Sequence, residues 1–546
     1  MNAASGSVLE QAGRAVPWYG FTQTDPNVLV PFAGYLVAVF VIAVLAHRHR
    51  RTASFESEYY VAGRGLGAWV LALSWVATMF SGGAFIGYPS LIYSYGWTVA
   101  FWVSGSIVTA LVGLGIAGKR INRLARQTGA LTLVDLLRDR FRSNAVGILC
   151  ILVIIPPTLV YLIAQFAAGT RVLQAMLGTT YPTCLVLFTL SVVAYTTYGG
   201  FRAVAWTDTL QGIVMIAGIL VLVPLAVSAA GGLEAATRQL ATRDDPVAMD
   251  RGLETAPHSY LYGPGPEKVV ATETGAPAEE APQSDPWLPF SMGISLFLLR
   301  PLSSVLAPTT VPRMLAFRDT AALRRALILI APYFLLMYGG SLITMNCAYS
   351  LDLGLSPLES DQAVPEVAKR VAPPLLAGLL IAAPFAAVMS TVDSALLVIS
   401  ASVVRDIVQK TWYPQLDERS VKTLIYAVTG GAGILVFVLT LLIEPVFLQP
   451  LVIHYGGAVT AALFWPGIAT LFWQRATRAG VIGGLAGGPL VYLACVVSPP
   501  LGEVLPMHPF VYGFFGSALT VYLGSILTTP QDRGQLTRYF GIDPRG

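Results

Sequence analysis

Long apolar runs recur along almost the whole chain and are separated by short polar segments. Most runs hold about 20 residues, the length that a helix needs to cross a hydrocarbon core about 30 Å thick. The pattern predicts thirteen spanning helices, at residues 29–46, 67–93, 97–117, 145–175, 181–198, 207–229, 287–308, 322–350, 375–407, 421–442, 446–472, 478–498 and 508–528. We therefore expect an all-α polytopic membrane protein.

Lysine and arginine gather in every second loop. The basic loops follow the odd-numbered helices and include 47–51, 119–126, 138–142, 313–325, 405–422 and 475–478. Loops after even-numbered helices are short or acidic, and the longest, 230–286, carries ten acidic and four basic residues. Cytoplasmic loops carry the excess of positive charge. The pattern thus predicts a multi-pass cell-membrane protein with its N-terminus outside and its C-terminus in the cytoplasm.

The acidic loop divides the helices into two blocks of five, and the first helix of each block is interrupted. The interruptions contain Ser81-Gly82-Gly83 with Gly87 and Pro89 in one block, and Arg300-Pro301 with Pro308 in the other. Paired interrupted helices are typical of inverted-repeat transporters that bind solute near the middle of the membrane. Gly and Pro also permit close helix packing, and this alternative stays open.

The expected organisation follows from these divisions. It comprises an outer segment 1–28, an extra helix 29–46, a first five-helix repeat 67–229, a long acidic outer loop 230–286, a second five-helix repeat 287–472, two extra helices within 478–528, and a cytoplasmic tail 529–546.

One apolar helix, 384–406, carries a stripe of hydroxyl groups. At about 100° per residue, Ala387, Ser390, Thr391 and Ser394 fall on one face. Such hydroxyls often bond to carbonyls one turn earlier or on a neighbouring helix. Asp393 is different, because a carboxylate within a spanning helix usually faces an opposite charge, a cation or a water-filled cavity.

Composition further restricts the class of protein to which the chain can belong. Hydrophobic residues make up 55% of the chain and charged residues 12%. The four cysteines and five histidines lack metal-ligand spacing, and there is no phosphate loop or nucleophile motif. There is also no basic tract with interleaved aromatics. We expect neither an enzyme nor a nucleic-acid partner, and the sequence implies no protein partner.

Several segments together resemble the sodium:solute symporter family, and its pantothenate branch in particular. They are YYVAGRGLGAWVLALSWVATMFSGGAFIGYPSLIYSYG at 59–96, YTTYGGFRAVAWTDTLQG at 195–212, PTTVPRMLAFRD at 308–319, APFAAVMSTVDSALLVISASVVRD at 383–406 and FWPGIATLFWQRATRAG at 464–480. The resemblance covers roughly residues 29–500. It implies a LeuT-type fold of two inverted five-helix repeats and sodium-driven uptake of a small organic solute.

The resemblance also implies a sodium site made of oxygen atoms. Its ligands would be the backbone carbonyls of Ala77, Phe80 and Ala387 and the hydroxyls of Ser390 and Thr391. Oxygen ligands suit a hard cation such as Na⁺, and an interrupted helix frees carbonyls to provide them.

Arg300 is a departure from the family pattern and bears on the substrate. A guanidinium beside an interrupted helix can hold a carboxylate in a bidentate pair. An internal ion pair with Asp393 is an equally good interpretation. Ser81, Gln165 and Tyr88 complete the candidate substrate site, although a single aromatic in a spanning helix more often serves packing.

The sequence thus predicts a sodium-coupled importer of a small carboxylated, pantothenate-like anion that works by alternating access within the lipid bilayer. A short monocarboxylate or an amino acid is an alternative substrate. A transporter-like solute sensor is the alternative of another class.

Overall fold

The computed structural model describes residues 25–48, 54–241, 288–355, 357–444, 448–498 and 507–541. Within these ranges nearly every element is helical, and ten helices are long and apolar enough to cross a membrane. The expected all-α polytopic fold is confirmed. Most of the expected segments 1–28 and 230–286, and residues 542–546 of the tail, lie outside the described residues.

The first half of the chain is a succession of helices joined by short turns. They are α2 (Pro26–Arg48), α3 (Phe55–Val61), η1 (Ala62–Arg64), α4 (Ala68–Met79), η2 (Gly83–Gly87), α5 (Tyr88–Tyr95), η3 (Gly96–Val99), α6 (Ala100–Ile107), α7 (Thr109–Gly113), η4 (Leu114–Gly118), α8 (Lys119–Thr128), α9 (Leu133–Phe141), α10 (Asn144–Leu177), α11 (Tyr181–Ala229) and α12 (Leu233–Ala241).

The second half has the same character. Its elements are α14 (Phe290–Ser304), α15 (Val311–Ala316), α16 (Thr320–Ala348), η7 (Tyr349–Leu351), η8 (Pro357–Gln362), α17 (Ala363–Val371), α18 (Pro374–Ser400), η9 (Ala401–Trp412), α19 (Glu418–Ile443), α20 (Leu448–Phe472), α21 (Arg478–Val497), α23 (Pro509–Ile526) and α24 (Arg533–Phe540).

Each predicted apolar run lies on helical structure, but the helices divide differently from the thirteen expected. Helix α11 covers two predicted runs, 181–198 and 207–229, and its helical path is broken by a kink between them at Gly200, with φ 64° and ψ −176°. A Cβ at Gly200 would lie 2.6 Å from the Tyr59 ring, so a glycine suits both the backbone and the contact. Helix α14 has only 15 residues. The count of thirteen stays a prediction.

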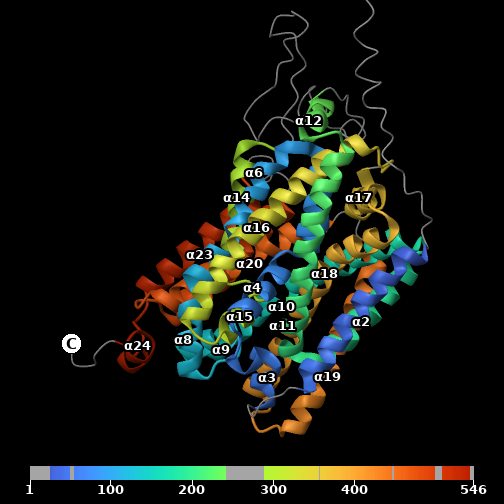
Figure 1. Cartoon of the computed structure of the whole chain (residues 1–546). Coiled ribbons are helices and arrows are strands. Elements are labelled where there is room, and N and C mark those ends of the chain that lie inside the picture. Colours follow the sequence, from blue (N-terminus) through green and yellow to red (C-terminus); the bar gives the residue numbers. More distant parts are fainter. Residues whose placement is uncertain are drawn as a thin grey trace, which may run out of the picture.

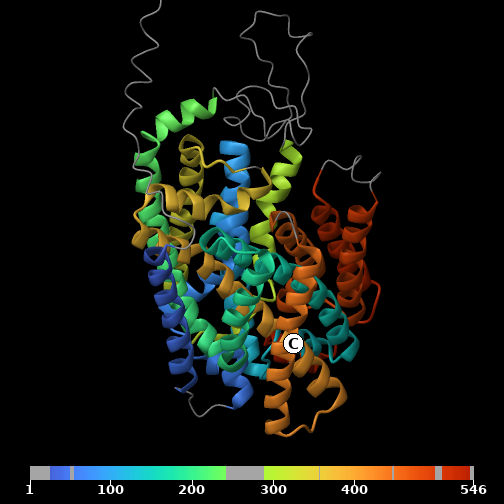
Figure 2. The same ribbon diagram turned by 90° about the vertical axis from the view of Figure 1, so that its right-hand side faces the viewer.

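Helix α18 is the most enclosed of the long helices. In its most apolar stretch 83% of residues are buried, against at most 61% in the other candidate spanning helices of the described chain. Figure 1 shows α18 within the bundle, with α2 and α23 toward opposite flanks. In Figure 2 the red C-terminal helices again lie across the molecule from the blue α2. The hydroxyl stripe of α18 is therefore surrounded by other helices.

The predicted interruption in α4 is present. Helix α4 ends at Met79, because Phe80 adopts φ −87° and ψ 64° and leaves the helical path. The chain then passes close to two other helices, so that a Cβ on Gly82 would lie 2.7 Å from Gln165 Oε1 and 2.9 Å from Val388. Helical structure resumes in η2.

The interruption expected at Arg300-Pro301 and Pro308 is present at its Pro308 end. Pro301 is inside α14, which ends at Ser304, and residues 305–310 form turns before α15 begins. In these turns the Thr310 backbone N–H donates to the Ala307 carbonyl at 2.9 Å. Arg300 consequently projects from regular helix.

Backbone contact at Gly105 gives a stability prediction. A Cβ at this position would lie 2.1 Å from the Phe297 carbonyl oxygen, a contact between α6 and α14. We expect Gly105→Ala to lower the melting temperature, at a cost of about 1–3 kcal/mol for overpacking. The melting temperature is measured by fluorescence-detected thermal unfolding in detergent. Gly339→Ala on α16 is the control, because its Cβ meets nothing within 4 Å, and equal melting temperatures for the two variants would contradict the prediction.

Candidate sodium and substrate sites

Helices α4 and α18 meet through oxygen atoms at the interruption of α4. Ser390 Oγ donates to the Ala77 carbonyl at 2.8 Å and lies 3.0 Å from the Ala387 carbonyl. Thr391 Oγ1 lies 2.9 Å from the same Ala387 oxygen and 3.4 Å from the Thr78 carbonyl. The structure thus brings together four of the five predicted sodium ligands, and it adds the Thr78 carbonyl, which the sequence reasoning missed.

Phe80, the fifth predicted ligand, lies where the chain leaves α4. Its backbone N–H donates to the Val76 carbonyl at 2.7 Å and closes the last helical turn. Its ring packs against Tyr338 with 4.6 Å between centroids. Among the described residues, the hydroxyls of α18 make no hydrogen bond to the Phe80 carbonyl, so this residue lies beside the oxygen cluster rather than within it.

Arg300 points toward the interrupted end of α4. Its Nη2 donates to the Met79 carbonyl at 2.8 Å, and the side chain interacts electrostatically with the phenols of Tyr338, Tyr88 and Tyr161. The residue is 9% exposed, and its Nε has no hydrogen-bond partner within the described chain. Buried donors are normally satisfied, so this guanidinium has capacity for a ligand or water.

Asp393 does not pair with Arg300, so the predicted ion pair is not formed. The carboxylate is fully buried, and it accepts a hydrogen bond from Tyr195 at 2.5 Å and another from Thr196. Both donors lie on α11. The sequence did not show this, because the register between α11 and α18 arises from packing.

The other candidate substrate residues lie around the interruption. Gln165 Oε1 accepts from the Gly82 backbone N–H at 3.0 Å, which leaves its Nε2 without a partner among the described residues. The buried Ser81 hydroxyl is likewise unpaired there. Tyr88 is placed 3.3 Å from the Ser106 hydroxyl. Ser81, Gln165 and Arg300 therefore each offer an unused polar atom.

Aromatic rings enclose this region. Tyr161 and Tyr455 stack with 4.2 Å between centroids, and Tyr455 OH lies 3.5 Å from Thr309 Oγ1. The ring centroids of Tyr88 and Tyr338 lie 6.0 Å apart. Tyr338 and Tyr455 were not singled out from the sequence, since one tyrosine in an apolar helix resembles any other packing residue.

Comparison with known proteins agrees with this geometry. The model of the "Sodium:solute symporter family" matches residues 59–488, most of the chain. The chain belongs to the sodium:solute symporter family. It is therefore a sodium-coupled solute transporter of the membrane rather than an enzyme.

Relatives cover almost the full length of this symporter. The sodium/pantothenate symporter of Escherichia coli is 30% identical over 91% of this chain and 96% of the relative. The corresponding protein of Haemophilus influenzae is 30% identical over 85% of this chain and 89% of the relative. The high-affinity proline transporter of Bacillus subtilis is 26% identical over 88% and 94%.

Solved structures support the fold. A sodium-coupled sialic acid symporter in a substrate-bound outward-open state aligns with a TM-score of 0.71 at 20% identity, over 94% of this chain and 99% of that one. Mhp1, a nucleobase-cation-symport-1 transporter in a closed conformation, aligns with a TM-score of 0.53 at 15% identity, over 89% and 98%. The predicted LeuT-type fold is confirmed.

A buried ion pair lies directly beside the oxygen cluster of the symporter. Arg313 Nη2 is 2.6 Å from Asp208 Oδ2, and both side chains are fully buried. Arg313 also donates to the Ser74 carbonyl at 3.0 Å, the Thr309 carbonyl at 2.8 Å and the Ser394 hydroxyl at 2.9 Å. The pair thereby joins α4, α11, α15 and α18.

In the predicted spans Arg202 and Asp208 lie at helix ends, where charges commonly pair, and Arg313 belongs to the basic loop 313–325. Arg202 does make such a pair, at 2.7 Å from Glu58. Asp208 and Arg313 instead lie in the interior. Asp208 is the second residue of the predicted run 207–229, so the sequence pattern did not indicate that its carboxylate is buried and needs a partner.

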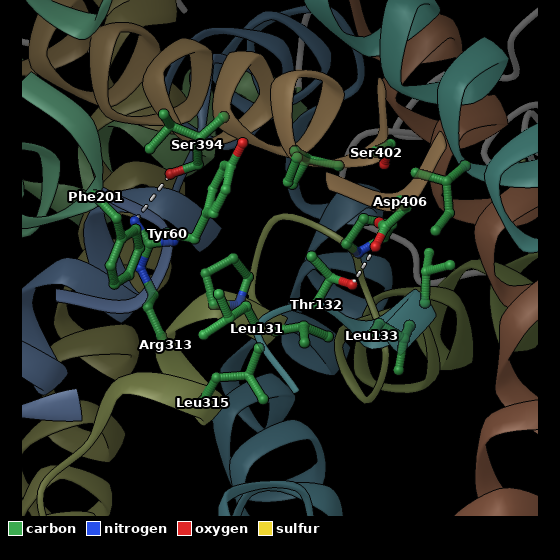
Figure 3. Close-up of a pocket in the computed structure, with 18 residues that line it drawn as sticks. Tyr60, Leu131, Thr132, Leu133, Phe201, Arg313, Leu315, Ser394, Ser402 and Asp406 are labelled. Atoms are coloured by element: carbon green, nitrogen blue, oxygen red, sulfur yellow. Dashed lines mark hydrogen bonds between the residues drawn. The ribbon is translucent and has the colours of Figure 1, made fainter. Parts of the chain in front are cut away.

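A pocket extends from this ion pair along α18 and η9. Figure 3 shows Arg313 and Ser394 at one end and Thr132 with Asp406 at the other. Its walls come from α3, α9, α10, α11, α15, α18 and η9, and they include Tyr60, Phe201, Leu131, Leu133, Leu315 and Ser402. The pocket therefore begins one helical turn from Ser390.

The buried pair gives a second stability prediction. Asp208→Asn leaves the Arg313 guanidinium without a counter-charge, and we expect a loss of about 3–5 kcal/mol in the free energy of unfolding. Thermal unfolding and yield of folded protein measure this. Glu234→Gln removes half of an exposed pair, with side chains 79% and 80% exposed, and should change stability by less than about 1 kcal/mol. Equal stability of the two variants would show that Asp208 is not needed to balance Arg313.

Proposed function

We propose that this symporter imports a small solute with a carboxylate group, which Arg300 binds, and that the driving Na⁺ lies between α4 and α18. Arg300 itself is the observation that supports the substrate class most directly. It is a buried guanidinium whose Nη2 donates to a backbone carbonyl and whose Nε has no hydrogen-bond partner within the described chain. A carboxylate would supply the missing charge and two acceptors for the planar fork.

The surroundings of Arg300 favour a solute that also has hydrogen-bonding groups. Gln165 Nε2 and Ser81 Oγ are unpaired near the same interruption, and rings such as Tyr161 and Tyr455 provide apolar walls. A pocket with apolar walls and a few fixed polar atoms is typical of small-molecule sites. Relatives named for pantothenate at 30% identity support pantothenate as the leading candidate. Relatives named for proline make an amino acid the alternative.

The cation site rests on oxygen chemistry. Carbonyls of Ala77 and Ala387 and hydroxyls of Ser390 and Thr391 converge within hydrogen-bond distance, and they lie in the enclosed part of α18. A sodium ion between them would exchange the hydroxyl-to-carbonyl hydrogen bonds for metal coordination. Phe80 joins this set in our proposal, if its carbonyl turns toward the ion.

Sodium and solute are coupled through the interrupted end of α4. Ala77 and Thr78 contribute carbonyls toward α18, while the next carbonyl, that of Met79, is bound by Arg300. An ion and a solute that both stabilise the same arrangement of α4 raise each other's affinity by the same factor. Movement of one five-helix repeat against the other then exposes both ligands to alternate sides.

The orientation in the cell membrane is also a proposal. The basic loops that include α8 and α9 support a cytoplasmic location for the end of the molecule that carries these helices. The pocket that contains Asp406 would then open toward the cytoplasm.

Substrate binding by Arg300 is tested by Arg300→Gln in proteoliposomes. Sodium-driven uptake would be screened over labelled pantothenate, lactate, acetate, proline and a sugar. Loss of charge-assisted hydrogen bonds worth about 1.5–3 kcal/mol should raise the KM for the carboxylated solute by at least about tenfold. Arg171→Gln is the control, because Arg171 packs over the Tyr181 ring away from the interruption. Unchanged uptake kinetics in Arg300→Gln would remove the substrate role.

The sodium site is tested by the double variant Ser390→Ala and Thr391→Ala. Removal of two ligands should raise the half-saturating sodium concentration by about tenfold or more, or abolish sodium stimulation. Thr460→Ala is the matched control, because Thr460 is a buried hydroxyl that bonds within its own helix to the Gly456 carbonyl. Sodium dependence equal to that of the control would refute this site.

A further inference from the structure

Asp406 lies at the far end of the pocket shown in Figure 3 and is not part of the sites described above. It is 1% exposed, and its Oδ1 accepts from Thr132 Oγ1 at 2.8 Å. Its Oδ2 is buried and has no hydrogen-bond partner among the described residues. A buried carboxylate oxygen without a donor is costly unless water or a cation reaches it.

Nearby basic residues do not satisfy this carboxylate. Arg405 is bound by Glu56 and lies 3.4 Å from Asp135. Arg138 donates from Nη2 to the Asp406 backbone carbonyl at 2.9 Å rather than to the side chain. Glu56 and Asp135 thus pair with Arg405, whereas the Asp406 carboxylate makes no ion pair within the described chain.

The pocket offers further oxygen atoms along its length. Ser402 lines it close to Asp406, and Tyr60 contributes a buried hydroxyl that is unpaired within the described chain. At the opposite end Ser394 Oγ donates to the Ser390 carbonyl at 3.0 Å, so the pocket adjoins the oxygen cluster of α4 and α18. Arg313 lies between the two regions, with its charge balanced by Asp208.

We propose that Asp406 and Thr132 form a second, transient sodium site, which holds the ion after it leaves the Ala77–Ser390 cluster and before it is released. This inference rests on the proposed function and on the cytoplasmic orientation of the pocket. Carboxylate and hydroxyl oxygens are suitable ligands for Na⁺. One carboxylate with few fixed ligands binds weakly, which suits a site from which the ion must depart.

Sided transport measurements test the proposal. In proteoliposomes of defined orientation, sodium on the cytoplasmic side should inhibit net uptake by occupying the Asp406 site. In Asp406→Asn the inhibitory internal sodium concentration should rise by about tenfold, while the half-saturating external concentration stays within about twofold of wild type. Asp406→Glu should retain inhibition. Asp139→Asn is the control, since Asp139 is at the same end of the bundle but is bound by Tyr539 and Arg538.

Two results would overturn the inference while leaving sodium-coupled uptake in place. One is internal inhibition unchanged in Asp406→Asn, and the other is a shift of the external sodium dependence instead. Absence of sodium-dependent uptake in the wild type would instead contradict the proposed function itself. The experiment therefore distinguishes failure of the Asp406 site from failure of the proposed function.

A labelling measurement covers the case in which Asp406→Asn does not fold. Ser402→Cys places a thiol on the pocket wall and leaves Asp406 in place. A cationic methanethiosulfonate should react with this thiol faster than an anionic one, and sodium should slow the cationic reagent. The background rate from the four native cysteines is taken from the wild type. If both reagents react at equal rates and sodium has no effect, the proposal that the Asp406 carboxylate binds cations is refuted.

Discussion

The end of α4 at Phe80 is the constraint on which the rest of the site depends. A helix that stops inside the bundle leaves carbonyl groups without intrahelical donors, and in a membrane each of them needs a partner. The structure provides these partners from two directions. Hydroxyls of Ser390 and Thr391 reach the Ala77 and Thr78 carbonyls, and the Arg300 guanidinium reaches the Met79 carbonyl. Successive carbonyls on one interrupted helix thereby face the candidate cation site and the candidate substrate site.

Buried charge organises the neighbourhood of this interruption. The Asp208–Arg313 pair holds four helices together, while Asp393 is bound by two hydroxyl groups of α11. Asp208 Oδ1, Arg300 Nε and Asp406 Oδ2 each lack a hydrogen-bond partner within the described chain, but of these three residues only Asp208 belongs to an ion pair there. Paired charges fix the packing of helices, whereas charges with free capacity are suited to ligands that arrive and leave. In our proposal, Asp208 and Arg313 therefore belong to the scaffold of the symporter, and Arg300 and Asp406 to its transport path.

Much of the architecture could be predicted from the chain alone. The length of the apolar runs determined a helical membrane protein, since only regular helices satisfy the backbone in hydrocarbon at that length. The Ser81-Gly82-Gly83 sequence located the interruption, and the spacing of Ser390 and Thr391 placed both hydroxyls on one face of α18. These properties are local, because they depend on residues within a few helical turns of one another. The exact bounds of the helices were less accessible. The kink between the runs 181–198 and 207–229 lies at Gly200, where the Tyr59 ring leaves no room for a Cβ, and this contact is not local in the sequence.

Partners between helices were decided by tertiary structure. The sequence showed that Asp393 and Arg300 are charges within predicted spans, but it placed Asp208 at the start of a span and Arg313 in a loop, and it did not show which charges meet. A pair between Asp393 and Arg300 was one of two interpretations. In the structure Asp393 instead accepts hydrogen bonds from Tyr195 and Thr196, and Arg300 donates to the Met79 carbonyl. The rotation and depth of each helix come from packing against all its neighbours. A shift of one residue turns a side chain by about 100°, so no periodicity along a single helix determines which charge it faces.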